Sequence, residues 1–182
     1  TVPVAPFIPG APPPPQPKPP MPASDLQHRP AETADLPAIV QFPQSAEELF
    51  YCFPRARWPL DVSQLASAMA ERQDSTLILL DRRPAAFANF YQCQPGEYCA
   101  LGNLMVAPWA RQRGIAAHLV GLMEQRAREQ HQARELRVSC FNGNSAGLLL
   151  YPRLGYQPYA LVERQDWLGR RVALIQFSKA LS

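Results

Sequence analysis

The stretch VAPWARQRGIAAHLV, residues 106–120, places two arginines and a glycine where an extended segment ends and an apolar-periodic segment begins. The first N–H groups of a helix have no partner within the helix, and the helix dipole adds positive potential there. Gly114 would let a ligand approach the backbone without a Cβ in the way, while Arg111 and Arg113 supply charge in fork geometry. The segment from Arg111 to Ala116 therefore predicts a pyrophosphate-binding site.

Known phosphate-binding patterns do not explain this stretch, because the sequence has neither G-x-x-x-x-G-K-[ST] nor G-x-G-x-x-G. Taken alone, it is also compatible with a surface pair of arginines beside a glycine that starts a helix. A second observation is needed to decide between these two interpretations.

The second stretch that could do chemistry is NSAGLLLYPRLGY, residues 144–156. Its apolar run predicts a short helix that Gly155 ends. The segment contains one tyrosine within the expected helix, Tyr151, and the following Pro152 removes a helical hydrogen bond and can kink the chain.

The elements that must position these residues follow from hydrophobic periodicity and turn residues. Asp61 is expected to cap a helix, and Thr33 is expected to cap an earlier one. Gly114 is expected to open a helix that fades near His131. The expected strands are residues 26–29, 75–80, 85–93, 98–106, 135–141, 156–164 and 170–181, and the later helices are residues 62–73, 114–131 and 144–154.

Composition limits the function classes. The net charge of +3 is too small to argue for nucleic-acid binding. Its distribution is uneven: residues 1–100 carry 7 Lys/Arg against 10 Asp/Glu, and residues 101–182 carry 11 against 5. No stretch approaches the roughly 20 apolar residues of a membrane span, so neither nucleic acid nor membrane is an expected partner. The first 24 residues are close to half proline and are expected to form an arm, which leaves a domain at residues 25–182.

The four cysteines form no C-x-x-C pair, so no metal site is expected. Cys93 and Cys99 flank an expected hairpin turn and face each other only if that loop has three residues. Free thiols and a reducing, cytoplasmic compartment are the expectation. His118 and His131 are expected to lie on the surface of the long helix, and His28 in a strand.

With both stretches present in this order, the sequence resembles the GNAT N-acetyltransferase superfamily. The first stretch matches R/Q-x-x-G-x-G/A after a strand ending in V-x-P, and the second matches N-x-x-A/G-x-x-L-Y-x-x-x-G-F/Y. The resemblance covers about residues 26–180. It implies an α/β fold, the GNAT acyl-CoA N-acyltransferase fold, with a mixed central sheet in the order β-α-α-β-β-β-α-β-α-β-β and helices on both faces.

The resemblance also implies roles for single residues. The backbone of residues 113–116 would bind the pyrophosphate of acetyl-CoA, and the strand at residues 104–106 would pair with the pantetheine arm. A β-bulge near residues 103–105 would splay this strand from its neighbour and aim an amide at the thioester carbonyl. Tyr151 takes the position that family members often use as general acid, where a phenol with an ordinary pKa of about 10 stays protonated at neutral pH and could donate to the departing CoA thiolate. The alternative is that Tyr151 only packs against CoA, and Pro152 could tilt it away from the sulfur. The implied cofactor-binding residues are Leu104, Met105, Val106, Arg111, Gln112, Arg113, Gly114, Ile115, Ala116 and Asn144.

The acceptor must lose a proton before it attacks. Glu47 and Glu48 are candidate bases because they lie where the family builds its acceptor pocket, and Glu97 is a third. A solvated acidic face and a water relay remain the alternatives. Arg55 and Arg57 lie in the same aromatic-rich stretch and could bind a carboxylate.

We therefore expect an enzyme that moves acetyl from acetyl-CoA to a primary amine by direct attack, without a metal. A homodimer stays open, as does the identity of the acceptor. The alternative is a non-catalytic acyl-CoA sensor or interaction module that docks through its proline-rich arm.

Overall fold

The apolar stretches of the sequence become the strands of one seven-stranded sheet with the order β1-β2-β3-β4-β5-β7-β6. The computed structural model describes residues 25–182, so the expected proline-rich arm lies outside the described residues. Only β4 and β5 are parallel, and the other neighbours are antiparallel. The strands are β1 Leu26–Pro30, β2 Gln73–Leu80, β3 Arg83–Gln94, β4 Tyr98–Val106, β5 Glu135–Phe141, β6 Gln157–Gln165 and β7 Arg171–Ala180.

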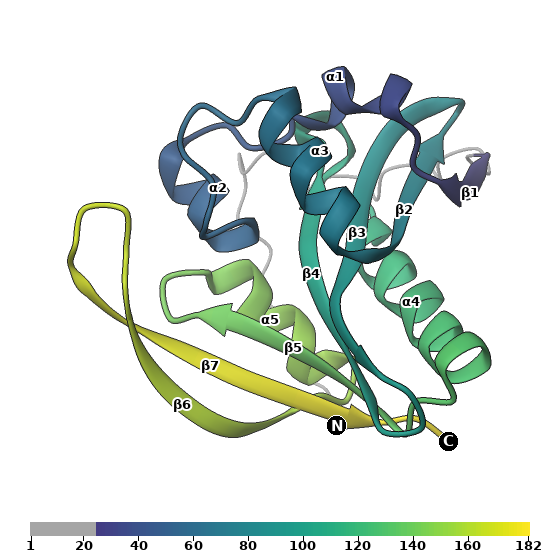
Figure 1. Ribbon diagram of the computed structural model, residues 1–182, viewed down its shortest axis with the longest axis vertical. Coiled ribbons are helices and arrows are strands. Elements are labelled where there is room, and N and C mark those ends of the chain that lie inside the picture. Colours follow the sequence, from purple (N-terminus) through teal and green to yellow (C-terminus); the bar gives the residue numbers. More distant parts are fainter. Residues whose placement is uncertain (1–24) are drawn as a thin grey trace, which may run out of the picture.

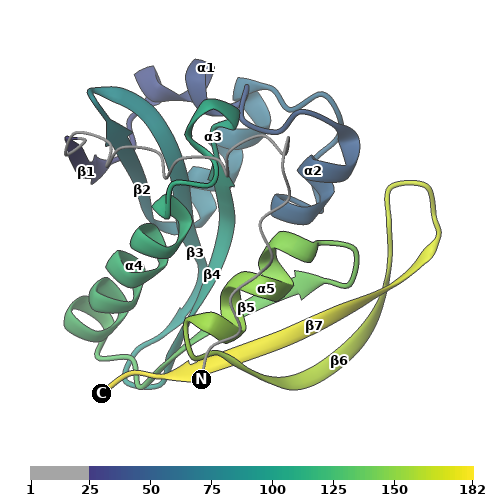
Figure 2. The same ribbon diagram turned by 180° about the vertical axis from the view of Figure 1, so that it is seen from behind.

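Helices cover both faces of the sheet, as predicted. In Figure 1, α3 crosses in front of the sheet, and Figure 2 shows α4 and α5 on the opposite face. None of the helices in residues 25–182 combines the length and the apolar composition that crossing a membrane requires. The helices are α1 Leu36–Ile39, α2 Ala46–Cys52, α3 Val62–Glu71, α4 Ile115–His131 and α5 Ser145–Arg153.

Side-chain caps set where the early helices begin. Asp61 accepts a hydrogen bond from the Gln64 amide at 2.9 Å, so the predicted cap of α3 is confirmed. The prediction for Thr33 was wrong, because Glu32 is the N-cap of a short 3₁₀ turn at Thr33–Asp35. Besides this 3₁₀ turn, three α-helices rather than the expected two separate β1 from β2.

The hydrophobic core includes buried side chains of α1, α3 and α4 together with those of the central strands. Leu119, Val120 and Met123 of α4 are fully buried, as are Phe87 and Phe90 of β3. Burying each of these side chains stabilises the fold by about 1.5–3 kcal/mol. The core thereby fixes α4 and its N-terminal end relative to β3 and β4.

Candidate active site

The two parallel strands at the centre of the sheet separate along their length (Figure 1). β4 pairs with β5 only at residues 98–100 opposite residues 135–137. Beyond Ala100, β4 is paired with β3 on one side, and no pairing with β5 continues on the other. The edge of β4 at residues 101–105 therefore has no β5 partner and faces the opening, as an added strand would need.

A bulge in β4 accompanies this separation, as predicted. Phe87 pairs with Met105 and Asn89 pairs with Gly102, so β4 carries one extra residue between these pairs. Asn103 lies in the bulge with a left-handed φ of 50°, a conformation that asparagine tolerates better than most residues. The bulge bends β4 at the point where it leaves β5.

A buried hydrogen-bond network holds the bulge in place. Asn103 donates from Nδ2 to the carbonyl oxygen of Cys52 at 3.0 Å and accepts from Asn89 at 3.0 Å. Asn89 in turn accepts from Arg72 at 3.2 Å. Because both asparagines are almost fully buried, removing one would leave its partner unpaired at a cost of about 1–3 kcal/mol. The network connects α2 and the end of α3 to the bulged strand. The sequence did not predict these hydrogen bonds.

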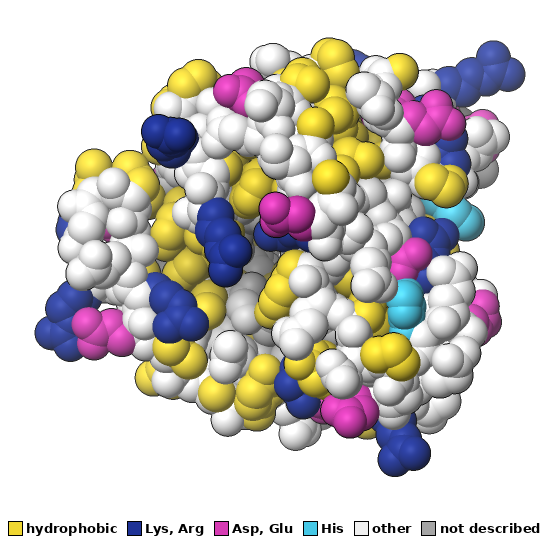
Figure 3. Space-filling model, viewed as in Figure 1, with side chains coloured by type: hydrophobic (Ala, Val, Ile, Leu, Met, Phe, Trp, Pro, Cys, Tyr) yellow, Lys and Arg dark blue, Asp and Glu magenta, His cyan; other side chains and the backbone are white. Residues whose placement is uncertain are grey.

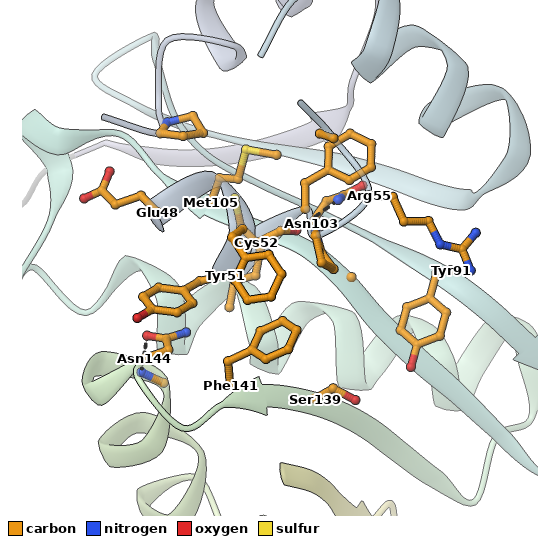
Figure 4. A pocket seen from close by; sticks show the side chains of 18 of the residues that line it. Glu48, Tyr51, Cys52, Arg55, Tyr91, Asn103, Met105, Ser139, Phe141 and Asn144 are labelled. Carbon is orange, nitrogen blue, oxygen red and sulfur yellow. Dashed lines mark hydrogen bonds between the residues drawn. The ribbon is translucent and has the colours of Figure 1, made fainter. Parts of the chain in front are cut away.

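A cavity of about 1130 Å³ lies along the opening between β4 and β5. Figure 3 shows it as a hollow with hydrophobic walls and several basic side chains around it, and Figure 4 shows the residues inside. Phe50 of α2 packs against Phe141 of β5, with ring centroids 4.3 Å apart, and against Trp167 of the β6–β7 turn, at 5.6 Å. These aromatic contacts connect α2 to β5 and to the last hairpin, and so build one wall of the cavity.

The predicted pyrophosphate-binding segment lies at the N-terminal end of α4. Gly114 is the N-cap and has a left-handed φ of 77°, which a glycine adopts without strain. A Cβ at Gly114 would meet nothing within 4 Å, and residues 111–114 are exposed. Ala116 also lines the cavity. The geometry therefore offers an open helix N-terminus beside the cavity, as the sequence predicted.

The side chain of Arg111 does not point freely into solvent. It binds Glu48 with both terminal nitrogens, at 2.7 and 3.2 Å, and donates from Nε to the carbonyl oxygen of Val106 at 3.2 Å. It also reaches the carbonyl oxygen of Phe42 at 3.1 Å. Arg111 thus joins the start of α4 to α2 across the cavity, which the local sequence pattern could not indicate.

The Arg111 guanidinium holds the pKa of Glu48 below its ordinary value, with help from the backbone N–H of Gln44 and against the effect of burial. A carboxyl with a lowered pKa is a weak base, because its proton affinity is reduced. This environment favours a positioning role for Glu48 over proton abstraction.

Replacing Glu48 should change the acid sensitivity of the fold. With a lowered pKa in the folded state, the pair stabilises the protein above the ordinary glutamate pKa and loses this contribution as pH falls through the folded value. Glu48→Gln should therefore have a lower melting temperature than the wild type at neutral pH, and the difference should vanish in the acid range. Thermal denaturation across pH measures it. A difference that stays constant with pH would mean that the ionised pair contributes nothing.

Tyr151 and Asn144 both line the cavity from α5. Asn144 is the N-cap of α5, and its Oδ1 accepts the Gly147 amide at 3.1 Å (Figure 4). Tyr151 is buried, and burial raises the pKa of its phenol. Pro152 lies in the last turn of α5, one residue before the helix ends at Arg153. The kink that could have displaced Tyr151 does not remove it from the cavity.

The other candidate bases lie apart from this cavity. Glu47 is exposed, accepts a hydrogen bond from the Tyr51 hydroxyl at 3.2 Å and lines a smaller neighbouring pocket of about 250 Å³. Glu97 lies in the β3–β4 turn, at the opposite end of β4 from the bulge, outside the cavity lining. The expectation that His131 is a surface residue was wrong, because it is half-buried against Asp74 with 2.6 Å between Nε2 and Oδ2.

The cavity contains more positive charge than the sequence suggested. Its lining includes the two expected arginines, Arg55 and Arg57, and also Arg72, the C-cap of α3, and Arg164 of β6. The sequence did not single out Arg72 and Arg164, because neither belongs to a local pattern that indicates a binding site. Only the packing of α3 and the last hairpin brings them together.

Comparisons with known proteins agree with this geometry. A search of curated proteins finds no match. The family model described as "Acetyltransferase (GNAT) family" matches residues 41–156. The ribosomal-protein-S18-alanine N-acetyltransferase of Escherichia coli has a similar structure, with a TM-score of 0.69 at 21% identity over 87% of this chain and 95% of that one. The ribosomal-protein-alanine N-acetyltransferase of Brucella melitensis gives 0.67 at 22% identity, over 85% and 99% of the two chains.

A third similar structure is a Salmonella typhimurium protein described as an acetyltransferase and solved with its cofactor acetyl-CoA. Its TM-score is 0.67 at 17% identity, over 87% of this chain and 95% of that one. These structural likenesses support the fold, and the family model covers more than half of the sequence, including both stretches that carry the motif. The chain therefore belongs to the GNAT acetyltransferase family.

Proposed function

We propose that this protein transfers the acetyl group of acetyl-CoA to a primary amine that also carries a negatively charged group. The observation that carries the proposal is the cavity between β4 and β5, which has a helix N-terminus at one side and a group of arginines at another. The first feature suits the phosphates of the donor, and the second suits an anionic acceptor.

The donor would bind along the unpaired edge of β4. Its pyrophosphate would accept hydrogen bonds from the backbone amides of residues 113–116, at the positive end of the α4 dipole. Its pantetheine arm would pair with Leu104 and Val106. Arg111 already bonds the Val106 carbonyl, so we propose that it positions this edge and α2, while Gln112 and Arg113 face the phosphates.

The amine would attack the thioester carbonyl directly. The carbonyl oxygen gains negative charge in the tetrahedral intermediate, and an amide of the bulge near Met105 would stabilise it. When the intermediate collapses, the C–S bond breaks and Tyr151 would donate its proton to the departing thiolate. Because Glu48 is committed to Arg111, we propose that the amine proton leaves through water rather than to a carboxylate of the cavity.

The choice of acceptor rests on charge. The lining holds five arginines and two glutamates, and one of each is consumed by the pair between Arg111 and Glu48. Four arginines then remain against Glu71. Such an excess creates a positive potential that a concave, partly apolar site concentrates. An amine bearing a carboxylate or a phosphate would be attracted, whereas a purely cationic amine would be repelled.

The test replaces the two arginines that lie in the loop between α2 and α3. Arg55→Gln with Arg57→Gln should raise the KM for an acidic amine about fivefold, since two exposed ion pairs contribute together about 1 kcal/mol. The KM for acetyl-CoA should stay within experimental error. Steady-state kinetics with a panel of acidic, neutral and cationic amines measures both constants.

The control is Arg82→Gln, which removes one positive charge in the exposed β2–β3 turn, outside the cavity lining. The difference between the double variant and this control should shrink at high salt, because screening weakens the attraction. A panel in which cationic amines are the best substrates would contradict an anionic acceptor, and binding of acetyl-CoA without any transfer would favour a non-catalytic module.

A further inference from the structure

A cluster of metal-ligating side chains lies at the far end of the sheet from the acetyl-CoA side. The sulfur atoms of Cys93 and Cys99 and a ring nitrogen of His131 all lie within 4.8 Å of one another. Cys93 belongs to β3, Cys99 to β4 and His131 to the last residue of α4. At 1.5 Å per residue, α4 separates this cluster from Gly114 by about 25 Å.

The hairpin register brings the two cysteines together. Gln94 pairs with Tyr98, so the loop has three residues and Cys93 lies directly opposite Cys99. The turn is attached to the end of α4, because the Gly96 amide donates to the carbonyl oxygen of His131 at 2.9 Å. Backbone hydrogen bonds therefore hold the main chain at Cys93, Cys99 and His131 close together, and only side-chain rotation changes the distances between the sulfurs and the imidazole.

A carboxylate orients the imidazole. His131 Nε2 lies 2.6 Å from Asp74 Oδ2, and Asp74 is held in the irregular start of β2 with a left-handed φ of 54°. When Nε2–H donates to this carboxylate, Nδ1 keeps its lone pair free for a ligand. A histidine that donates its second N–H to a carboxylate is the usual arrangement around a metal-bound imidazole.

We infer that Cys93, Cys99 and His131 form a zinc site, with Asp74 orienting the histidine and water in the fourth position. Two sulfurs and one imidazole nitrogen are the ligand types that Zn²⁺ prefers. Bonds of about 2.3 Å to sulfur and about 2.0 Å to nitrogen put tetrahedral ligand atoms roughly 3.3–3.8 Å apart. The three groups reach that spacing by side-chain rotation, since they already lie within 4.8 Å.

Bound zinc would connect the β3–β4 hairpin to the C-terminal end of α4. The sequence predicted no metal site because it contains no C-x-x-C pair, whereas these ligands come from three elements. The same two cysteines could instead form a cross-strand disulfide, and the experiment must separate the two cases. Their thiols are free in this structure, as are those of Cys52 and Cys140.

The test uses the full chain, freed of metal and reduced with a phosphine. Titration with Co²⁺ should give thiolate-to-cobalt charge-transfer absorption that saturates at one equivalent and is displaced by Zn²⁺. Zinc should also raise the melting temperature, because it binds only the folded arrangement of ligands. Cys93→Ser should weaken zinc binding at least tenfold. Cys93 is only partly buried, so serine fits in its place.

Two further variants sharpen the result. Cys52→Ser removes a cysteine outside the cluster and should leave zinc affinity unchanged. Asp74→Asn keeps a residue that tolerates the left-handed backbone, and should weaken zinc binding about tenfold while the cobalt–thiolate absorption persists. Absence of charge transfer, equal affinity in Cys93→Ser, or a disulfide formed with glutathione disulfide in a protein that binds no cobalt would overturn the proposal.

Discussion

Tyr151→Phe should lower kcat by about 10²–10⁴ and leave the affinity for acetyl-CoA nearly unchanged. The substitution removes one hydroxyl and keeps the ring, so the packing of Tyr151 against Tyr156 and Phe177 survives. If the hydroxyl protonates the departing thiolate, its contribution exists only in the transition state. The loss should therefore appear in kcat, with acetyl-CoA binding intact by calorimetry.

The pH profile gives a second measure of the same role. Burial raises the pKa of Tyr151 above its ordinary value, so the phenol stays protonated across the neutral and moderately alkaline range. A general acid works only while protonated, and wild-type kcat should show no alkaline decline due to Tyr151 near the ordinary tyrosine pKa of about 10. The acid therefore has its proton wherever the amine acceptor is deprotonated enough to attack.

Tyr156→Phe is the matched control. Tyr156 contacts Tyr151 edge to face, with ring centroids 5.8 Å apart, and its hydroxyl donates to Glu124 at 2.8 Å. This variant removes a buried hydroxyl from the same aromatic group without touching the cavity lining. It should lower the melting temperature and leave kcat nearly unchanged. Equal kcat for Tyr151→Phe and the wild type would leave Tyr151 as a packing residue.

The sequence predicted the strands and helices well where turn residues and capping residues mark their ends. The hairpin turn between β3 and β4 and the cap at Asp61 depend on residues only a few positions apart, so local rules place them, although the sequence left the length of that turn open. The same locality made Gly114 predictable, since a left-handed N-cap depends on one residue. The helices between β1 and β2 were predicted less well, because three α-helices form there where two were expected.

The charged side chains of the site could not be assigned in this way. Glu48 is a good candidate base by its neighbours in sequence, but its environment is set by Arg111, which lies 63 residues further along the chain. Likewise, the first half of the chain is net acidic, yet the arginines that reach the cavity come from four different segments. The net charge of a segment says nothing about which side chains point inward, so we propose an anionic acceptor although the first half of the chain is net acidic.

The same limit applies to the hydrogen-bond network around the bulge. Two asparagines within apolar strands, Asn89 and Asn103, are a recognisable signal, because buried amides need partners. The partners themselves, Arg72 and the carbonyl oxygen of Cys52, follow only from how α2 and α3 lie across the sheet. A sequence can therefore indicate that a polar side chain in a strand needs hydrogen-bond partners, although it does not indicate which residues supply them.

Gly114→Asp should weaken acetyl-CoA binding at least tenfold, which corresponds to about 1.4 kcal/mol. The carboxylate would lie at the N-terminus of α4, where we propose that the pyrophosphate accepts hydrogen bonds from the amides of residues 113–116. Like charges at that distance repel, and a Cβ also fills the space that the phosphate would use. In the free protein nothing lies within 4 Å of this position, so the loss should come from the ligand and not from a clash.

Backbone strain must be separated from charge, because Gly114 has a left-handed φ of 77°. Gly96→Asp is the matched control: Gly96 has a φ of 76°, it too has nothing within 4 Å of a Cβ, and it lies in the β3–β4 turn away from the cavity. Both variants should lose similar stability, since each places the same residue in the same conformation. Only Gly114→Asp should lose affinity for acetyl-CoA when calorimetry is done on folded protein.

A neutral substitution separates the effect of charge from the effect of side-chain shape. Gly114→Asn has nearly the shape and left-handed tolerance of aspartate without its charge, so it isolates the steric part of the effect. The gap between the asparagine and aspartate variants measures repulsion of the phosphates, and it should narrow as salt screens the charges. If both bind acetyl-CoA as tightly as the wild type, the phosphates do not bind at the start of α4, and the donor must enter the cavity from another side.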